Sequence, residues 1–289
     1  MARLAERLDE NEAGEFFVDA SCIDCDLCRQ LAPRVFARSE RLGLSVVRAQ
    51  PRSIDDEERA LVALVTCPTS SIGSVHKLDP RRAAARLPEP RGGGVHFVGY
   101  ASADSYGASS WLLVRESGNV LVDSPRAVRS LCDRIDALGG VRWLVLTHRD
   151  DVADHAALAA RFRCERVLHR ADLSSGTRGV EHVVDGDAPI ALDRELTIVP
   201  VPGHTRGSIA LHAGDALFTG DHLAGDDDGE LHAWRSVCWY SWPEQLRSLE
   251  RLLPLDFCRV FPGHGRPFET PDASEMRAAL ARLIARVRR

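Results

Sequence analysis

Two patterns of apolar residues alternate through the second part of the chain. Short apolar runs, rich in valine and leucine, predict strands over residues 110–115, 119–123, 141–146, 166–169, 195–201, 208–213 and 216–219. Spacings of three and four predict helices over 125–138, 152–162, 243–253 and 274–287. Strands interleaved with helices indicate a layered α+β domain.

A change in composition divides the chain into two parts. Residues 81–94 (RRAAARLPEPRGGG) hold two prolines and a run of glycines, which is typical of a linker. The chain has 289 residues, which fits about two domains. We therefore expect a small domain over 1–80, a linker over 81–94 and a larger domain over 95–289.

Composition and charge exclude several classes of protein. The hydrophobic fraction of 44% and the charged fraction of 27% are ordinary for a globular protein. A net charge of -5 argues against nucleic-acid binding. No run approaches 18 apolar residues, so we expect no membrane segment. The N-terminus lacks the apolar core of a secretory signal, which predicts a cytoplasmic protein.

The spacing of cysteines in the first part predicts an iron–sulfur site. In a cytoplasmic chain, eight cysteines favour metal binding over a disulfide framework. Cys22, Cys25 and Cys28 are separated by two residues each, and Cys67 comes later, directly before Pro68. Three close thiolates and one remote thiolate can hold the corners of a [4Fe–4S] cluster. Zinc is the competing metal, but zinc ribbons usually carry two separated cysteine pairs.

This part of the chain, about residues 13–78, resembles a single-cluster bacterial ferredoxin domain. The resemblance rests on the motif C-I-D-C-D-L-C and on the later C-P-T. It implies a role in electron transfer or redox sensing. Up to Pro80 there are 10 basic and 14 acidic residues, which suits docking to a basic surface of a redox partner protein.

Four further motifs place histidine and aspartate directly after apolar runs. They are T-H-R-D-D-V-A-D-H from Thr147, P-G-H-T-R-G-S from Pro202, F-T-G-D-H from Phe218 and P-G-H-G from Pro262. Loops at strand ends are where binding and catalytic residues concentrate. Imidazole and carboxylate groups together form a ligand set for zinc, iron or manganese. The motifs therefore predict a metal site that takes a small-molecule substrate.

Together these motifs are similar to those of the metallo-β-lactamase fold superfamily, over about residues 94–270. The resemblance implies an αββα sandwich with one or two divalent metals, zinc being the first expectation and iron or manganese the alternatives. It implies that one metal is held by His148, His204 and Asp221. The residues implied for the other metal are Asp154, His155, Asp221 and His264.

The first motif departs from the pattern of this superfamily, H-x-H-x-D-H. Two extra residues separate His148 from Asp154, and Asp150 stands where a second histidine belongs. One alignment keeps His148 and makes Asp150 a metal ligand; the other keeps Asp154 and His155 and empties half of the first site. We prefer the first, and we interpret Asp151 as a cap for the helix predicted from residue 152. An oxygen donor at this position favours iron or manganese as a tendency.

Three classes of function remain open. The first is a metal-dependent hydrolase of an ester, thioester or phosphoester, in which Asp154 also orients the attacking hydroxide. The second is an iron-dependent oxidoreductase that receives electrons from the ferredoxin module. The third is a non-catalytic iron–sulfur sensor. We rank the hydrolase first because the later motifs are complete. The aromatic segment 238–242 (CWYSW) is interpreted as core packing, with a wall of the active site as the alternative.

Overall fold

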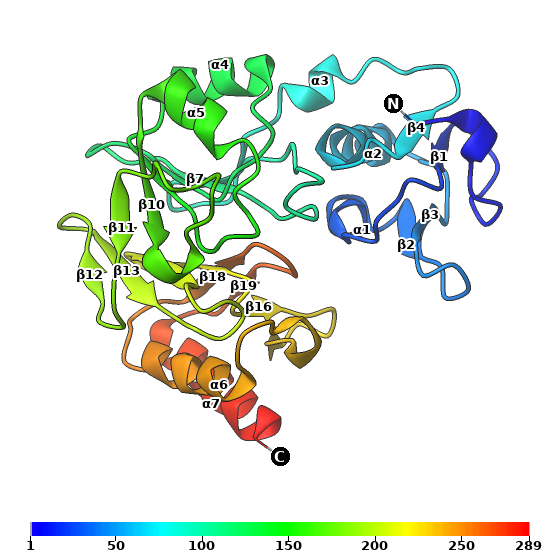
Figure 1. Cartoon of the computed structure of the whole chain (residues 1–289). Coiled ribbons are helices and arrows are strands. Elements are labelled where there is room, and N and C mark those ends of the chain that lie inside the picture. The colour runs from blue at the N-terminus through cyan, green and yellow to red at the C-terminus, as the bar shows by residue number, and fades with distance from the viewer. Residues whose placement is uncertain (1, 289) are drawn as a thin grey trace.

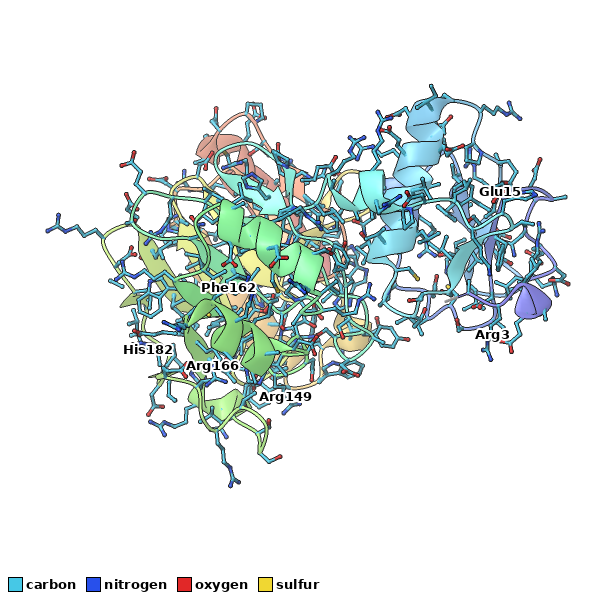
Figure 2. The ribbon with its side chains drawn as sticks, turned by 90° about the horizontal axis from the view of Figure 1, so that it is seen from above. Arg3, Glu15, Arg149, Phe162, Arg166 and His182 are labelled. Atoms are coloured by element: carbon cyan, nitrogen blue, oxygen red, sulfur yellow. The ribbon has the colours of Figure 1, made fainter. Side chains whose placement is uncertain are left out.

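The computed structural model describes residues 2–288, which form a small N-terminal module followed by two packed sheets (Figure 1). In the view from above, Arg3 and Glu15 lie on the outer side of the N-terminal module, and Arg166 and His182 lie on the far side of the second domain (Figure 2). The two parts share one hydrophobic core, which runs from Phe16 to Phe261.

The N-terminal module consists of short strands held together by two helices. Its elements are η1 (Leu4–Glu6), β1 (Phe16–Val18), α1 (Leu27–Leu31), β2 (Phe36–Arg38), β3 (Ser45–Val47), α2 (Ile54–Thr66) and β4 (Ile72–Ser74). Strand β1 pairs antiparallel with β4, and β2 forms a hairpin with β3. The side chain of Ser53 accepts a bond from the Asp56 N–H at the start of α2, which satisfies one free donor of the helix.

Residues 81–94 lie against the rest of the protein. They contain α3 (Arg81–Ala84) and β5 (Glu89–Pro90), and β5 pairs antiparallel with β6 (Val95–Phe97). Leu87 is fully buried, and Arg59 of α2 donates to Glu89 at 2.8 Å. The segment predicted as a linker is therefore packed at the contact of the two parts, and the domain boundary itself stays a prediction.

The first sheet has seven strands in the order β11-β10-β9-β8-β7-β6-β5. Its further members are β7 (Trp111–Leu113), β8 (Val120–Val122), β9 (Trp143–Val145), β10 (Glu165–His169) and β11 (His182–Val184). Strands β8 to β11 are parallel, and the others are antiparallel. Strands β8 and β9 are buried on both faces, as their continuous apolar sequences predict.

The second sheet has six strands in the order β12-β13-β14-β15-β18-β19. These are β12 (Ile190–Ala191), β13 (Leu196–Pro200), β14 (Ile209–Ala213), β15 (Ala216–Gly220), β18 (Arg259–Pro262) and β19 (Phe268–Glu269); the short pair β16 (Ala224–Gly225) and β17 (Leu231–His232) lies beside them. Strands β13, β15 and β18 run in the same direction, so their carboxyl ends meet at one edge.

Helices cover the outer faces of the two sheets (Figure 1). Helices α4 (Arg129–Ala137) and α5 (His155–Phe162) lie on the first, and α6 (Trp242–Leu252) and α7 (Ala273–Val287) lie on the second; η2 (Arg170–Asp172) and η3 (Arg235–Val237) are single turns. The apolar stripe predicted for the last helix is confirmed, since Met276, Leu280 and Leu283 are at most 1% exposed. Within residues 2–288, we find no helix with the length and hydropathy needed to cross a bilayer.

Candidate metal sites

The four cysteines predicted to hold a cluster line a single cavity in the N-terminal module. Cys22, Cys25 and Cys28 come from the loop before α1 and from α1 itself, and Cys67 follows the end of α2. All four are free thiols. The structure therefore brings the predicted set together.

The backbone between the first three cysteines explains how they reach one cavity. Asp24 and Asp26 adopt left-handed conformations, with φ of 56° and 69°. Aspartate tolerates this conformation better than most residues. Arg29 holds the turn by donating to Asp24 at 2.6 Å and to Asp26 at 2.5 Å. The two turned residues let the cysteines that flank them face the same point.

The environment of the cysteines fits a metal-bound thiolate. Burial raises the pKa of Cys25 to about 12 and raises that of Cys28 further. Negative charge on such buried sulfurs needs a cation beside it, which iron supplies in a cluster. The hydroxyl oxygen of Ser71 lies 3.3 Å from Cys67 Sγ, and contacts of this kind tune the reduction potential of a cluster. The donor set thus fits an iron–sulfur cluster.

The histidines and aspartates of the second domain come from strand ends in both sheets. His148 follows β9, His204 lies between β13 and β14, Asp221 follows β15 and His264 follows β18. Because β13, β15 and β18 are parallel to one another, their carboxyl ends deliver His204, Asp221 and His264 to one edge, and β9 of the other sheet supplies His148. The sheet topology therefore assembles motifs that are far apart in the chain.

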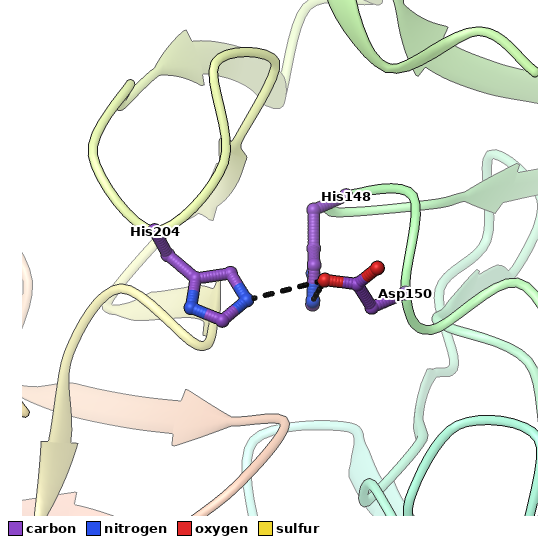
Figure 3. A group of neighbouring side chains, drawn as sticks. All are labelled: His148, Asp150 and His204. Atoms are coloured by element: carbon purple, nitrogen blue, oxygen red, sulfur yellow. Dashed lines mark ion pairs between the residues drawn. The ribbon is translucent and has the colours of Figure 1, made fainter. Parts of the chain in front are cut away.

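His148, Asp150 and His204 point toward one another (Figure 3). Nε2 of His204 lies 3.5 Å from Oδ2 of Asp150 and 3.6 Å from Oδ2 of Asp221. Nε2 of His148 lies 3.9 and 3.8 Å from the same two oxygens. The two imidazole rings are nearly perpendicular, with centroids 4.7 Å apart. His148, Asp150 and His204 thus form one group of donors, and Asp221 approaches it through both histidines.

These four atoms fit the donors of a divalent metal. Nε2 of His148 and Nε2 of His204 are buried and have no hydrogen-bond partner among residues 2–288. Separations of 3.5–3.9 Å are too long for hydrogen bonds. Two ligand atoms that each lie about 2.1 Å from a tetrahedral metal are about 3.4 Å apart. A cation beside the two histidines would satisfy both nitrogens and would be attracted by both carboxylates.

Asp151 belongs to a second group of donors, with His148 and Asp221. It is 1% exposed, and its Oδ2 is buried without a partner in the described part of the chain. A Cβ at Gly263 would lie 2.8 Å from both Asp151 Oδ2 and Asp221 Oδ1, so the glycine of the P-G-H-G motif leaves room for the two carboxylates. Burial and the charge of Asp221 raise the pKa of Asp151 well above its usual value. A bound cation would offset the free-energy cost of keeping the buried Asp151 carboxylate ionised beside Asp221.

The interpretation of Asp151 as a helix cap is wrong. Helix α5 begins at His155, and Asp154 is its N-cap residue. Asp151 enters the site because the chain turns inward before the helix, where its backbone carbonyl accepts a bond from Ser124 N–H at 3.2 Å. The sequence alone favoured the cap because Asp151 directly precedes the apolar spacing that starts at Val152.

Asp154 and His155 lie outside the two groups of donors. Oδ2 of Asp154 accepts a bond from the Ala127 N–H at 2.8 Å. Nδ1 of His155 lies 3.3 Å from Nη1 of Arg166, and burial and that guanidinium lower the pKa of His155. The structure thus brings together His148, Asp150, His204 and Asp221 of the predicted ligands, but not these two.

His264 contacts the site through Asp221. Its Nδ1 lies 2.9 Å from Asp221 Oδ1, and its Nε2 lies 3.4 Å from the carbonyl oxygen of Tyr106. Burial opposes a charge on His264, but the Asp221 carboxylate outweighs burial and raises the pKa to about 10. Burial would raise the pKa of Asp221, but His264, together with the two other histidines, holds it well below its usual value. Asp221 is therefore the anionic centre of the site.

Two aspartates that the sequence analysis missed hold the ligands in place. The carboxylate of Asp123 accepts hydrogen bonds from the backbone N–H of Thr147 at 2.7 Å and from the Thr147 hydroxyl at 3.0 Å. The Thr147 hydroxyl oxygen in turn lies 3.0 Å from Nδ1 of His148. A support of this kind orients a ligating histidine so that its other nitrogen faces the metal. Burial lowers the pKa of His148 to about 4, which keeps it in the neutral, ligating form.

Asp172 joins two of the motif loops. It is fully buried and accepts from the backbone N–H of Arg149 at 3.0 Å, from that of Gly207 at 2.9 Å and from the Thr205 hydroxyl at 2.5 Å. Asp123 and Asp172 each follow closely on an apolar strand, which is the signal that could have identified them in the sequence.

The aromatic segment 238–242 borders the site, and the expectation of core packing is wrong for its central residues, whereas Trp242 does pack against the core. Trp239 is 61% and Tyr240 49% exposed. Both donate from the backbone to the carbonyl of His204, and the Trp239 ring centroid lies 6.2 Å from that of His204. His222, which follows Asp221, is buried with both ring nitrogens unpaired within residues 2–288, but it belongs to neither group of donors.

Comparison with known families finds two matches in the chain. Residues 18–74 match the family model of the 4Fe-4S single cluster domain of ferredoxin I, and residues 104–264 match that of the metallo-beta-lactamase superfamily. The resemblances drawn from the cysteine spacing and from the four motifs are thereby confirmed.

Relatives and solved structures agree with these matches. A hydroxyacylglutathione hydrolase of Stenotrophomonas maltophilia (strain R551-3) is 35% identical over 127 residues, which are 43% of this chain and 48% of the relative. The acyl-coenzyme A thioesterase MBLAC2 of Homo sapiens is 39% identical over 90 residues, 29% of this chain and 30% of the relative. The chain spans about half the length of the hydroxyacylglutathione hydrolases it matches.

The fold is also that of a solved structure. A metallo beta lactamase from Hirschia baltica superposes with a TM-score of 0.50 at 20% identity, covering 68% of this chain and 95% of the other. The predicted fold class, a ferredoxin-like module followed by an αββα sandwich, is confirmed. Since the second family model covers more than half of the chain, the protein belongs to the metallo-beta-lactamase superfamily.

Proposed function

We propose that the protein is a metal-dependent hydrolase whose reaction takes place at the His/Asp site. One observation carries this proposal: the unpaired Nε2 atoms of His148 and His204 converge with the carboxylates of Asp150 and Asp221. Two buried imidazole nitrogens without a hydrogen-bond partner are costly unless a cation lies beside them, and together with two carboxylates they are the ligand set of a catalytic divalent metal.

The proposed ligands differ from the sequence prediction at one point. His148, Asp150, His204 and Asp221 hold the first metal. Asp221, His264 and Asp151 hold a second, where Asp151 replaces the predicted Asp154 and His155. The histidines favour zinc, and the added carboxylate makes manganese or iron the alternatives. A divalent metal bound here supplies a Lewis acid and a water that ionises near neutral pH.

The side chains themselves perform the remaining tasks. Asp221 lies between three histidines: it accepts a hydrogen bond from Nδ1 of His264 at 2.9 Å, and its charge faces His148 and His204 at 3.8 and 3.6 Å. Asp151 is the buried carboxylate beside the donors, and it, in place of Asp154, orients the attacking water. Trp239, on the border of the site, offers an apolar face to a substrate. Arg149, with half of its side chain exposed, adds a positive charge for an anionic substrate.

Thioesters are the first substrate class to test. The two relatives are named for hydrolysis of an acylglutathione and of acyl-coenzyme A. Both substrates carry negative charge beside the thioester, in keeping with the position of Arg149.

The test is a hydrolysis screen of acylglutathione and acyl-coenzyme A thioesters with the full chain, loaded with Zn²⁺ or Mn²⁺. We expect metal-dependent turnover that His148→Ala abolishes and that Lys77→Ala, a change in the N-terminal module, leaves unchanged. Absence of turnover on thioesters, esters and phosphoesters by the metal-loaded chain would overturn the proposal. Iron in the His/Asp site together with turnover that requires Cys67 would favour the oxidoreductase alternative.

For the N-terminal module we propose a [4Fe–4S] cluster held by Cys22, Cys25, Cys28 and Cys67. The support is their common cavity and the match to a single-cluster ferredoxin domain. A redox partner protein docks on the acidic module, and the cytoplasmic location stays a prediction of the sequence. Iron and sulfide counts, with the visible absorption of the anaerobically purified chain, test the cluster; fewer than about three irons per chain in this module would contradict it.

A further inference from the structure

One loop of the second domain touches both proposed metal sites. Residues 102–109 follow β6 and precede β7, and we name them the bridging loop. The loop is folded on itself, since the Gly107 N–H donates to the Ser102 carbonyl at 2.8 Å and the Ala108 N–H donates to the Ser105 carbonyl at 2.9 Å. A displacement at one end of so short a loop is therefore passed to its other residues.

At the N-terminal module, the bridging loop packs directly on a cluster cysteine. A Cβ at Gly107 would lie 2.6 Å from Cys25 Cβ, 2.9 Å from Cys25 Sγ and 3.2 Å from the ring of Pro68, which also lines the cysteine cavity. Gly107 also has φ of +85°, a conformation that disfavours other residues. The loop can approach the sulfur only because this residue is a glycine.

At the His/Asp site, the same loop holds the P-G-H-G motif by two hydrogen bonds. The carbonyl of Tyr106 accepts from Nε2 of His264 at 3.4 Å, and the Ser109 N–H donates to the Gly263 carbonyl at 2.7 Å. A ligating histidine commonly donates its second N–H to a backbone carbonyl, which fixes the ring so that the first nitrogen faces the metal. Here Nδ1 of His264 faces Asp221.

The base of the loop is tied to the fourth cysteine as well. The guanidinium of Arg126 donates to the carbonyl of Ala101, directly before the loop, at 2.8 Å. It also donates to the carbonyls of Val65 at 2.9 Å and Cys67 at 3.3 Å. One half-buried side chain therefore fixes the start of the bridging loop to the backbone that carries Cys67.

We infer that the bridging loop is a positioning element through which the cluster site controls the metal affinity of the His/Asp site. Gly107 sets the loop against Cys25, and the Tyr106 carbonyl sets His264 toward Asp221. A bound cluster would fix Cys25 and Cys67, the cysteines on which the loop rests, so cluster assembly orders the loop and tightens metal binding. Coupling between two binding sites is reciprocal, so metal binding also changes the reduction potential of the cluster. This inference rests on the proposed function and adds how metal binding at the His/Asp site is regulated.

Zn²⁺ affinity of the anaerobically purified full chain, measured by competition with a chelator, tests the inference. Gly107→Ala pushes the loop away from Cys25, and we expect about tenfold weaker Zn²⁺ binding, within the range found when the support of a ligand is lost. Gly186→Ala is the matched control, since Gly186 has φ of +82° and no atom within 4 Å of the added Cβ. It should bind Zn²⁺ as the wild type does.

A second variant covers the case in which Gly107→Ala does not assemble the cluster. Arg126→Met keeps the apolar stem and removes the donors to Ala101 and Cys67, and we expect several-fold weaker Zn²⁺ binding with the cluster intact. The reduction potential of the cluster is the second measurement. If the loop had only a structural role, this potential would not depend on Zn²⁺. Zn²⁺ should raise it in the wild type, since a cation stabilises the reduced cluster, and a tenfold coupling corresponds to about 59 mV for one electron.

Three results would overturn the inference. Equal Zn²⁺ affinity in Gly107→Ala, Arg126→Met and the wild type would show that the loop does not position His264. A cluster potential that is the same with and without Zn²⁺ would show that the sites are not coupled. Failure of the wild type to bind Zn²⁺ or Mn²⁺ at the His/Asp site would overturn the proposed function and the coupling with it, so the two failures are distinguishable.

Discussion

The cysteine site and the His/Asp site are assembled in opposite ways. Three of the four cysteines come from one short segment, the loop before α1 and its first turn, whose left-handed aspartates direct them to a common cavity. The His/Asp ligands come from the ends of strands in two sheets, and no two of the four motifs are adjacent in the chain. The first site therefore depends on a local backbone shape, and the second depends on how the whole sandwich is packed.

The two sites also differ in their charge before any metal is bound. Burial raises the pKa of Cys25 to about 12, so its thiol is neutral at pH 7. Asp221, in contrast, has a lowered pKa and is anionic, while burial lowers the pKa of His148 to about 4 and keeps that ring neutral. Asp221 and His148 are therefore already in their binding forms, whereas the buried thiol of Cys25 must release its proton when iron binds.

The largest expected effect is that of Asp221→Ala on the assembled site. Asp221 is a proposed ligand of both metals, since its Oδ2 lies 3.6 Å from Nε2 of His204 and its Oδ1 lies 2.9 Å from Nδ1 of His264. Its loss therefore removes a ligand from each proposed metal. We expect metal affinity and hydrolytic activity to fall more than about 100-fold, beyond the effect of losing an outer support. Metal analysis should still find the iron of the cluster; loss of both metals together would show that the two sites are not separately assembled.

Cys28→Ala is the corresponding change in the cysteine site of the N-terminal module. Cys28 is 9% exposed and lines the cysteine cavity, so its loss removes one corner of the cluster. We expect the iron of the module to fall well below that of the wild type, with the visible absorption lost. Saturating Zn²⁺ should still fill the His/Asp site, and failure to do so would contradict the comparison.

Asp151→Asn and Asp154→Asn form a matched pair that sharpens the comparison within one loop. Asp151 has a buried oxygen beside Asp221, so its change should weaken Zn²⁺ binding by about 10- to 100-fold. Asp154 accepts from the Ala127 N–H, so its change should cost about 1–2 kcal/mol of stability and leave Zn²⁺ affinity unchanged. A Zn²⁺ titration in which Asp154→Asn weakens binding and Asp151→Asn does not would instead support the sequence prediction that Asp154 is a ligand.

The smallest expected effect is on stability and concerns the ion pair of Arg166 and Glu181, which touches neither metal site. Hydrogen bonds from Arg166 outweigh partial burial and lower the pKa of Glu181 to about 2. Because this folded-state pKa lies below the unfolded value, the pair stabilises the protein above about pH 4.5 and loses this effect as the pH falls toward 2. The carboxylate is 40% exposed, so Glu181→Gln should cost less than about 1 kcal/mol at pH 7. Thermal unfolding at pH 7 and pH 3 measures this, and a larger loss at pH 3 would contradict it.

The contrast between the sites explains what the sequence could predict. The cysteine ligands follow from spacing, because the turn that unites Cys22, Cys25 and Cys28 is encoded in a few adjacent residues. Most strands and helices follow in the same way from apolar runs, such as 141–146 for β9. Gly220, Gly263 and the motif histidines could be located because each directly follows such a run.

The features of the site that the sequence does not predict depend on contacts between residues far apart in the chain. Whether Asp151 or Asp154 enters the site depends on where α5 begins, and the side chain of Asp154 is held by the distant Ala127. The supports Asp123 and Asp172 act through bonds across the sheet that no local pattern contains. The contact of Gly107 with Cys25 joins residues of two domains, so only the folded chain reveals it.

The central claim is that the His/Asp residues hold a divalent metal with Asp151 and without Asp154. Anomalous diffraction from crystals of the anaerobically purified full chain, recorded at the zinc, manganese and iron edges, tests it most directly. The account predicts one peak between His148, Asp150, His204 and Asp221, a second beside Asp151 and His264 at full loading, and a separate iron peak among the four cysteines. A peak ligated by Asp154 and His155, or no peak near His148, would contradict it.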